Sequence, residues 1–348
     1  MRALTVRPPA PMSAELVEVP EPGPEGGEIL CDTVAVGVDG TDNEIVEGKY
    51  GEAPPGRDRL VLGHESLGRV LEAPAGSGFA PGDLVIGVVR RPDPVPCANC
   101  AVGEWDMCRN GLYTERGIKG RDGFMSERFR IEQAFAVKAD PRLGRLGVLT
   151  EPTSVVAKAW EHVERIGWRA HFAPRSVLVT GAGPLGLLGA LLGAQRGLDV
   201  HVLDVVESGP KPDLAAKLGA TYHAGSLDDA GTDFDVVIEC TGVGPLVFHA
   251  IEHLAPDGIM CLTGISPAGR TDRLNLDALN KEMVLNNNVV FGSVNAGLRH
   301  YEQAAAALGA TDPAWLDSLV TRWVPLERWE EALERRPDDV KTVVEIAG

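Results

Sequence analysis

Long apolar runs are missing from this sequence. No stretch approaches the roughly 18 consecutive apolar residues that a membrane-spanning helix needs. The amino-terminal segment MRALTVRPPAP also lacks the continuous apolar core and the small-residue cleavage site of a secretory signal. We therefore expect a cytoplasmic protein without a membrane partner.

Basic residues are scarce as well. The chain has 33 Lys and Arg against 50 Asp and Glu, a formal net charge of -17. Binding the phosphates of nucleic acids or of anionic membranes requires clustered Lys and Arg side chains that release counterions. The charge balance argues against a nucleic-acid partner, and such acidity is also typical of a salt-adapted proteome.

Cysteines are few and unevenly spread. Six in 348 residues do not suit a disulfide framework in a cytoplasmic chain. Three of them crowd together as Cys97, Cys100 and Cys108. The other three stand singly beside apolar runs, where cysteine is typically a small buried hydrophobe.

The length and the order of patterns predict two domains, because 348 residues exceed what one hydrophobic core usually supports. Up to about residue 155, short β-branched runs such as GDLVIGVV are separated by Gly and Pro clusters. Apolar strands then alternate with helical segments, which predicts a doubly wound parallel sheet. The tail is assigned to the first domain because this sheet is already complete. The predicted domains are a β-rich one over residues 1–155 and 296–348, and an α/β one over residues 156–295.

A glycine pattern predicts a dinucleotide site in the second domain. Gly181, Gly183 and Gly186 form G-x-G-x-x-G between the strand SVLVT and an apolar helix. The first glycine permits a tight turn, the second lets the backbone approach a pyrophosphate, and the third brings helix onto strand. The helix N-terminus is then available to hold the phosphates. Pro184 and Leu185, inside the loop, are included in the predicted cofactor contacts.

Asp204 ends the next strand, 18 residues beyond Gly186. A carboxylate there accepts hydrogen bonds from the adenosine ribose and repels a 2′-phosphate. The following Val205 and Val206 offer no guanidinium for such a phosphate, although Lys211 is nearby in sequence. We expect NAD to be preferred, with NADP as the alternative.

Three short motifs stand in the first domain: GVDGTD at 37–42, GHE at 63–65 and TEP at 150–152. In this order, and with RRP, ERGI and GSVN along the chain, they resemble the zinc-dependent medium-chain dehydrogenases, in particular the halophilic-type archaeal glucose 1-dehydrogenases. The resemblance spans essentially the whole chain. It implies a GroES-like catalytic domain joined to a Rossmann domain, and a homo-oligomer, either a dimer or a tetramer, with the strand VVFGSV as the pairing edge.

The resemblance implies a catalytic zinc ion held by Asp39, His64 and Glu151, with Glu65 able to swing in. The family usually has Cys where this chain has Asp39, so zinc selectivity is expected to be weaker. Thr41 is the family's hydroxyl that hydrogen-bonds the reacting oxygen. The last cofactor contacts implied by the resemblance are Thr241 and Asn295.

The cysteine group resembles the last three positions of the family's zinc-binding lobe, C-x2-C-x2-C-x7-C, whose first position here is Pro94. A closed structural zinc needs four ligands. Asp93 is the nearest substitute, and Glu104 and Asp106 are alternatives. The alternative is a lobe that has lost its metal and carries three free thiols.

The subfamily contacts its sugar from positions that here are Glu115, Glu151 and Asn295, with Arg90 and His300 as further candidates. Such groups, buried without partners, would cost about 1 to 3 kcal/mol each, so simple alcohols should be rejected. We expect oxidation of an aldose, glucose at C1 to the lactone. A polyol, cyclitol or amino-sugar dehydrogenase of the same superfamily is the alternative. A non-catalytic NAD-binding redox sensor is the second alternative, and the retained metal motifs disfavour it.

Overall fold

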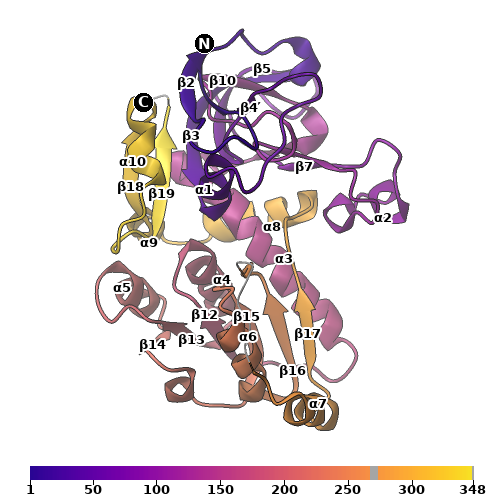
Figure 1. Cartoon of the computed structure of the whole chain (residues 1–348), viewed down its shortest axis with the longest axis vertical. Coiled ribbons are helices and arrows are strands. Elements are labelled where there is room, and N and C mark those ends of the chain that lie inside the picture. Colours follow the sequence, from indigo (N-terminus) through magenta and orange to yellow (C-terminus); the bar gives the residue numbers. More distant parts are fainter. Residues whose placement is uncertain (267–272, 347–348) are drawn as a thin grey trace. The chain divides into compact units, whose positions relative to one another are not determined.

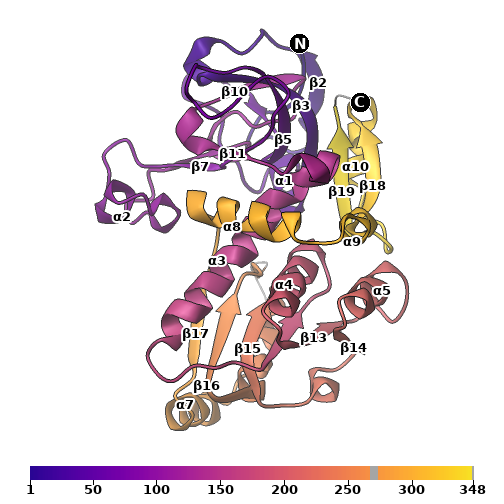
Figure 2. The ribbon, with the colours of Figure 1, turned by 180° about the vertical axis from the view of Figure 1, so that it is seen from behind.

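The structure is a computed structural model that describes residues 1–266 and 273–346. The chain forms two compact units, Met1–Ser154 with Asn295–Gly348, and Val155–Val294. Figures 1 and 2 show the ribbon from two opposite sides. In the described ranges, no helix is long and apolar enough to span a membrane.

The first unit is built on β-sheets. Its largest sheet has the order β11 (Ala136–Lys138), β6 (Leu84–Gly87), β5 (Glu65–Glu72), β3 (Ile29–Val38), β19 (Lys341–Glu345) and β18 (Val320–Pro325), and β10 (Arg128–Ile131) also pairs with β3. Two small sheets have the orders β2 (Glu15–Glu18), β1 (Arg2–Val6), β4 (Leu60–Val61), and β7 (Arg90–Arg91), β8 (Thr114–Arg116), β9 (Gly120–Arg121). Because β19 pairs with β3, the end of the chain completes the sheet that begins near its start.

Short helices connect these strands. They are α1 (Gly40–Val46), α2 (Ala98–Ala101), α8 (Leu298–Gly309), α9 (Pro313–Leu319) and α10 (Trp329–Leu333), with 3-10 turns η1 (Pro24–Gly26), η2 (Trp105–Met107), η3 (Gln133–Phe135), η4 (Pro141–Leu149) and η7 (Leu326–Arg328). Alternating apolar residues of β1, β3 and β5 fill the core, with Leu4, Val36 and Val70 almost completely buried.

The second unit is the predicted doubly wound sheet. Its order is β14 (Thr221–Ala224), β13 (Asp199–Asp204), β12 (Ser176–Thr180), β15 (Phe234–Glu239), β16 (Leu254–Leu262) and β17 (Val289–Gly292). All neighbouring pairs are parallel. This is the strand order of the Rossmann fold, whose ligand crevice opens between the first and fourth strands, here β12 and β15.

Helices cover both faces of this sheet, with α6 in front in Figure 1 and α4 in front in Figure 2. The elements are α4 (Pro184–Gln195), α5 (Pro210–Lys217), η5 (Leu227–Ala230), α6 (Gly244–His249), η6 (Ala250–His253) and α7 (Leu276–Leu285). The long helix α3 (Thr150–Gly167) begins in the first unit and continues in the second. Helix α4 is apolar all round and buried from Gly186 to Gly193, as expected for a helix packed inside a domain.

Candidate active site

Asp39 is positioned by the junction between β3 and α1. It is the N-cap of α1, and its Oδ1 accepts hydrogen bonds from the backbone N–H groups of Thr41 at 2.7 Å and Asp42 at 3.3 Å. Its Oδ2 accepts the Thr41 hydroxyl at 3.2 Å and lies 3.5 Å from His64 Nε2. Capping therefore fixes one carboxylate oxygen and leaves the other beside the imidazole.

His64 stands between β4 and β5, directly after Gly63. Gly63 has a φ of 86°, and a Cβ there would lie 2.7 Å from Val36 Cγ1, so the turn requires glycine. The His64 side chain is only 7% exposed, and its Nδ1 lies 3.8 Å from Asp42 Oδ1. The imidazole is thus held between two carboxylates.

Glu65 begins β5 and pairs in register with Gly37 of β3. A Cβ on Gly37 would lie 1.8 Å from Glu65 Oε2, so this glycine makes room for the carboxylate. The same oxygen forms an ion pair with Lys341 Nζ, and both side chains are almost completely buried. Lys341 also donates to the Val38 carbonyl at 3.0 Å.

Ligand atoms of Asp39, His64 and Glu65 lie within 4.8 Å of one another. Glu151, predicted as a further ligand, is buried at the start of α3 and stands outside this group. Its Oε1 accepts a long hydrogen bond from the Tyr301 hydroxyl, at 3.5 Å. The structure therefore brings three of the four predicted ligands together and sets the fourth close enough to influence their charge.

Burial and neighbouring charges shift the pKa values of these groups. Burial, with Asp39 as a neighbour, raises the pKa of Asp42 to about 7. Burial, with Glu65 and Asp39 as neighbours, raises the pKa of Glu151 to about 8. Burial alone would lower the pKa of His64, but the Asp39 carboxylate overcomes it and raises that pKa well above the ordinary value.

These residues fit a zinc ion. The protein has gathered four carboxylates, those of Asp39, Asp42, Glu65 and Glu151, around one imidazole. Burial and the neighbouring carboxylates raise the pKa values of Asp42 and Glu151. A dication would stabilise the charged carboxylates, and imidazole nitrogen with carboxylate oxygen is a donor set that zinc accepts. Asp39 and His64 would hold it, with Glu65 and Glu151 as the nearest further carboxylates.

The predicted sugar contacts Glu115 and Asn295 also meet in the first unit. Glu115 Oε1 accepts from Asn295 Nδ2 at 2.9 Å and from Arg90 Nε and Nη2 at 3.0 and 2.9 Å. Asn295 has a φ of 61°, a conformation that asparagine tolerates better than most residues. Arg90, one of the further candidates, thus positions Glu115, whereas the His300 ring accepts the Gly297 N–H at the start of α8 and acts as a cap.

The glycine loop has the geometry that the sequence predicts. Gly181 has a φ of 89°. A Cβ on Gly186 would lie 1.8 Å from the Gly181 carbonyl oxygen, whereas a Cβ on Gly183, the N-cap of α4, would meet no atom within 4 Å. Gly186 is therefore required by packing, and Gly183 keeps an open approach at the helix N-terminus. Pro184 and Leu185 form the first turn of α4.

Asp204 ends β13 beside this loop. Its Oδ2 accepts the Ala182 N–H at 2.7 Å, and its Oδ1 accepts the Val206 N–H at 3.1 Å. Lys211 Nζ contacts both oxygens, the nearer at 3.1 Å. The predicted ribose-binding carboxylate therefore also anchors the loop, and Lys211 offsets its charge.

Thr241 follows β15 at the opposite side of the crevice. Its N–H and its hydroxyl both donate to Glu239 Oε1. Its methyl carbon lies 2.9 Å from where a Cβ on Gly181 would be. The predicted contact Thr241 thus adjoins the first glycine of the loop.

The cysteine lobe extends from β7 and carries α2, as Figure 1 shows. The three sulfurs of Cys97, Cys100 and Cys108 lie within 4.8 Å of one another. The backbone N–H groups of Arg109 and Cys100 lower the pKa of the Cys97 thiol to about 6. The Asp93 carboxylate instead accepts the Val95 N–H at 2.8 Å and Asn110 Nδ2 at 2.7 Å. Three ligands are assembled, and the predicted fourth is engaged elsewhere.

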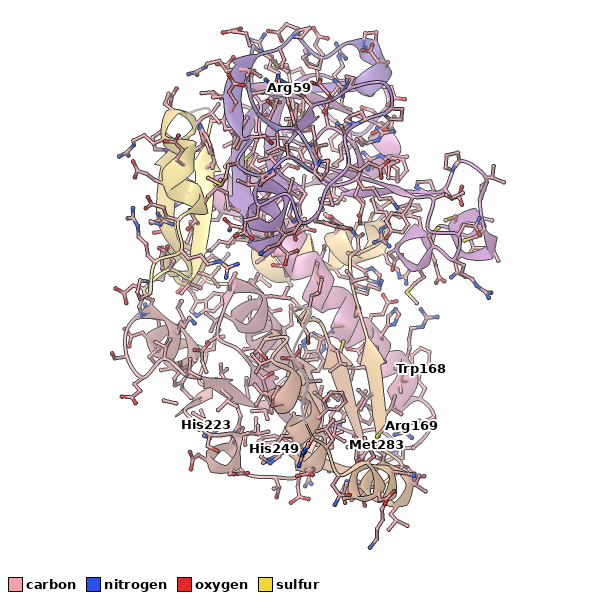
Figure 3. The ribbon with its side chains drawn as sticks, in the orientation of Figure 1. Arg59, Trp168, Arg169, His223, His249 and Met283 are labelled. Carbon is pink, nitrogen blue, oxygen red and sulfur yellow. The ribbon has the colours of Figure 1, made fainter. Side chains whose placement is uncertain are left out.

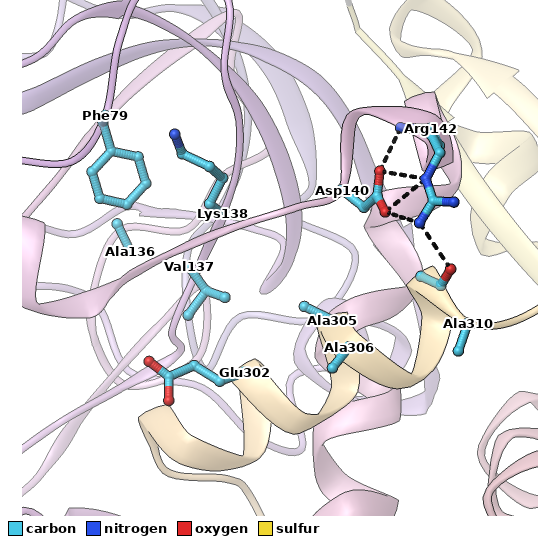
Figure 4. A pocket seen from close by; sticks show the side chains of 11 residues that line it. Phe79, Ala136, Val137, Lys138, Asp140, Arg142, Glu302, Ala305, Ala306 and Ala310 are labelled. Atoms are coloured by element: carbon cyan, nitrogen blue, oxygen red, sulfur yellow. Dashed lines mark hydrogen bonds and ion pairs between the residues drawn. The ribbon is translucent and has the colours of Figure 1, made fainter. Parts of the chain in front are cut away.

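Figure 4 shows a cavity of about 850 Å³ in the first unit, between β11 and α8. Asp140 and Arg142 pair across its edge, and Arg142 donates to the Gly309 carbonyl at 3.3 Å. None of the predicted site residues lines it. This cavity therefore lies apart from the metal-ligand group.

Sequence reasoning missed three residues of the metal-ligand group: Asp42, Tyr301 and Lys341. Asp42 had a local signal, since it stands at the third helical position after the N-cap Asp39, where an acidic side chain completes a capping box. No local sequence signal indicated Lys341 or Tyr301, because both come from the far end of the chain. Their positions depend on the pairing of β19 with β3 and on the packing of α8.

The chain matches two family models, "Alcohol dehydrogenase GroES-like domain" over residues 25–141 and "Glucose dehydrogenase C-terminus" over residues 144–346. A glucose 1-dehydrogenase of Thermoproteus tenax is 41% identical, and glucose 1-dehydrogenase 2 of Vulcanisaeta moutnovskia is 39% identical, each over 99% of both chains. A solved structure of Haloferax mediterranei glucose dehydrogenase, in complex with NADP, Zn and gluconolactone, is 33% identical. It matches with a TM-score of 0.92 over 100% of both chains.

The matches extend over both units, and the GroES-like and Rossmann fold predictions are confirmed. The metal-ligand group, the glycine loop and the full-length likeness agree with one another. The chain belongs to the glucose dehydrogenase family of zinc-type medium-chain dehydrogenases.

Proposed function

We propose that this protein oxidises glucose at C1 to the lactone, with zinc, and transfers the hydride to NAD or NADP. The observation that carries the proposal is the group of Asp39, His64 and Glu65 within 4.8 Å, with the Thr41 hydroxyl on Asp39 Oδ2. The full-length likeness to proteins named glucose 1-dehydrogenase supports the substrate.

Asp39 and His64 would hold the metal, and the Asp42 carboxylate lies 3.8 Å from His64 Nδ1 on the other side of the ring. When bound, zinc supplies Lewis acidity that eases loss of the proton from the substrate hydroxyl. Thr41 Oγ1 donates to Asp39 Oδ2 and can turn toward a substrate hydroxyl to accept a hydrogen bond from it. Lys341 pairs with Glu65 and holds it toward β19, so that Glu65 would serve as a reserve ligand.

The sugar would be recognised by Glu115, Asn295 and Glu151. Arg90 uses two nitrogens to hold Glu115 Oε1, so the carboxylate is oriented before a ligand arrives. Glu151, whose Oε1 lies 3.5 Å from the Tyr301 hydroxyl, can accept a hydrogen bond from a sugar hydroxyl. A simple alcohol would make fewer of these contacts than a sugar.

For the cofactor we propose NAD as the preferred oxidant and NADP as the second. The Asp204 carboxylate disfavours a 2′-phosphate, but Lys211 at 3.1 Å reduces this effect. The bound NADP of the Haloferax relative favours dual use. We further propose a cytoplasmic homo-oligomer, a dimer or tetramer, in which sheets pair through β17, which is an edge strand of its sheet. Sedimentation of the purified protein tests this assembly.

For the cysteine lobe we propose two alternatives. Either it holds a structural zinc, with Asp93 reorienting to complete the four ligands, or it is free of metal. Zinc analysis of the Cys108→Ser variant tests this choice. Loss of one equivalent relative to the unaltered protein supports the structural zinc, and an unchanged count supports the metal-free lobe.

The function is tested by initial rates on a panel of aldoses, polyols and simple alcohols, after chelation and again after zinc is restored. Glucose with zinc should give the highest kcat/KM, with the lactone as product. His64→Ala should lose more than about a hundredfold, because even outer-shell partners of a metal typically contribute 10- to 100-fold. His171→Gln, an exposed histidine, is the control and should retain full activity.

Three outcomes would overturn the proposal in different ways. Activity confined to non-sugar alcohols would remove glucose as substrate, and full activity after chelation would remove zinc. The absence of turnover with every substrate would favour the NAD-binding redox sensor. Thr41→Val with Thr41→Ser tests the hydroxyl separately, since serine should keep activity and valine should lose it.

A further inference from the structure

A second group of metal-ligand side chains lies in the dinucleotide-binding unit. Asp228 belongs to η5, His249 ends α6 and His253 ends η6. One ligand atom from each lies within 4.8 Å of the others. His249 and His253 are four residues apart, a spacing that places both imidazoles on one side of successive helical turns. Figure 3 labels His249 at this position.

The separations suit a shared ion. His249 Nε2 lies 3.5 Å from Asp228 Oδ1, and His253 Nε2 lies 3.8 Å from the same oxygen. Ligand atoms of a tetrahedral site with bonds of about 2.0 to 2.1 Å stand about 3.3 Å apart. Both distances from Asp228 Oδ1 are therefore slightly too long for good direct hydrogen bonds and near the spacing of zinc ligands. Glu252 Oε2, 3.7 Å from His249 Nε2, is a second carboxylate within reach.

The hydrogen bond of the His253 ring supports a metal site at this position. Its side chain is 5% exposed, and its Nδ1 lies 2.6 Å from the Gly231 carbonyl oxygen. A carbonyl only accepts, so Nδ1 donates to it, and Nε2 is the ring nitrogen that faces Asp228 and is placed to bind a metal ion. A backbone carbonyl on the far nitrogen is also how proteins orient metal-binding histidines.

We propose that Asp228, His249 and His253 form a binding site for a divalent transition-metal ion, with zinc as the preferred ion. Two imidazole nitrogens and one carboxylate oxygen suit zinc better than magnesium or calcium, which take mainly oxygen ligands. Water or Glu252 would supply the fourth ligand. The ion would join η5 to the ends of α6 and η6 and stabilise this part of the Rossmann unit.

The test is a zinc count on the full-length protein. Metal-free protein is titrated with Zn²⁺ at pH 7.5, and bound zinc is measured after removal of free metal. We expect His249→Gln and Asp228→Asn to bind one equivalent less than the unaltered protein, or to bind the last equivalent at least tenfold more weakly. Both side chains are largely exposed, so the variants should fold, which thermal unfolding without metal verifies.

Two matched controls separate the site from general charge effects. Asp229→Asn removes the same charge from the neighbouring residue, and His171→Gln removes an exposed imidazole elsewhere in this unit. Both should keep the full count. As a second readout, Zn²⁺ should shift the side-chain imidazole signals of His249 and His253 in nuclear magnetic resonance spectra. Equal zinc counts in all proteins, unshifted signals, or half-saturation only above millimolar Zn²⁺ would each overturn the proposal.

Discussion

Replacing Lys341 by Met tests how the metal-ligand group is balanced. Lys341 Nζ pairs with Glu65 Oε2, and the two side chains are 1% and 3% exposed. Methionine fills a similar volume but leaves the buried Glu65 carboxylate without its cation. Removing one partner of a buried ion pair typically costs about 3 to 5 kcal/mol, much of it the cost of the charge left behind.

The expected loss can be measured as a change in Tm. For a unit of this size, each kcal/mol shifts Tm by about 2 to 4 °C, so metal-free Lys341→Met should unfold about 6 to 20 °C lower. Glu65→Gln added to this variant should recover a large part of the loss, because the stranded charge disappears. Zinc should also recover stability in Lys341→Met, since the released Glu65 can then bind the metal.

Lys138→Met is the matched control. Lys138 pairs with Asp83 in the same sheet, but the two side chains are 46% and 24% exposed. Exposed pairs contribute about 0 to 1 kcal/mol, so Tm should hardly change. If Lys341→Met unfolds within about 2 °C of the unaltered protein, the buried pair does not stabilise the fold as reasoned here.

Three further predictions follow from the same structure. The metal-free protein should lose stability as pH rises from about 5 to 8. Asp42 and Glu151, with pKa values raised to about 7 and 8, bind protons in the folded state that the unfolded chain has already lost. Thermal unfolding in chelator across this range should show a falling Tm that zinc flattens, and a rising Tm would contradict it. Gly186→Ala should lower both Tm and cofactor affinity, because its Cβ would meet the Gly181 carbonyl, whereas Gly183→Ala should weaken cofactor binding with Tm unchanged. If calorimetry gives Gly186→Ala and Gly183→Ala the same Tm and the same cofactor affinity, these separate roles are refuted. Asp204→Asn should raise the ratio of kcat/KM for NADP to that for NAD by about tenfold, because an amide oxygen can still accept the Ala182 N–H without the negative charge. An unaltered enzyme that already favours NADP would overturn the role given to this carboxylate.

Local patterns predicted most of the fold and the residues of the site that carry motifs. Alternating apolar strands and helices predicted the parallel sheet, because both faces of its strands are buried. The glycine loop was recognisable since each glycine has its own role: Gly181 in the turn, Gly186 in packing and Gly183 in leaving an open approach at the helix N-terminus. Asp39, His64 and Glu65 were predicted from the order in which their motifs occur together along the chain. The structure brings their ligand atoms together.

The partners of these residues could not be predicted, because they depend on contacts between distant segments. Lys341 lies 303 residues after Val38, to which it donates. The loop-anchoring bond from Ala182 to Asp204 likewise became visible only in the folded unit. The meeting of His249 and His253 with Asp228 could not be predicted either, since Asp228 belongs to η5 and the two histidines come after β15.

The most direct test of the central claim is an anomalous-diffraction map, recorded at the zinc absorption edge, from crystals of active enzyme. We predict a peak bonded to His64 Nε2 and Asp39 Oδ2, at about 2.0 to 2.2 Å from each. An active crystalline enzyme with no peak between these two side chains would contradict the account.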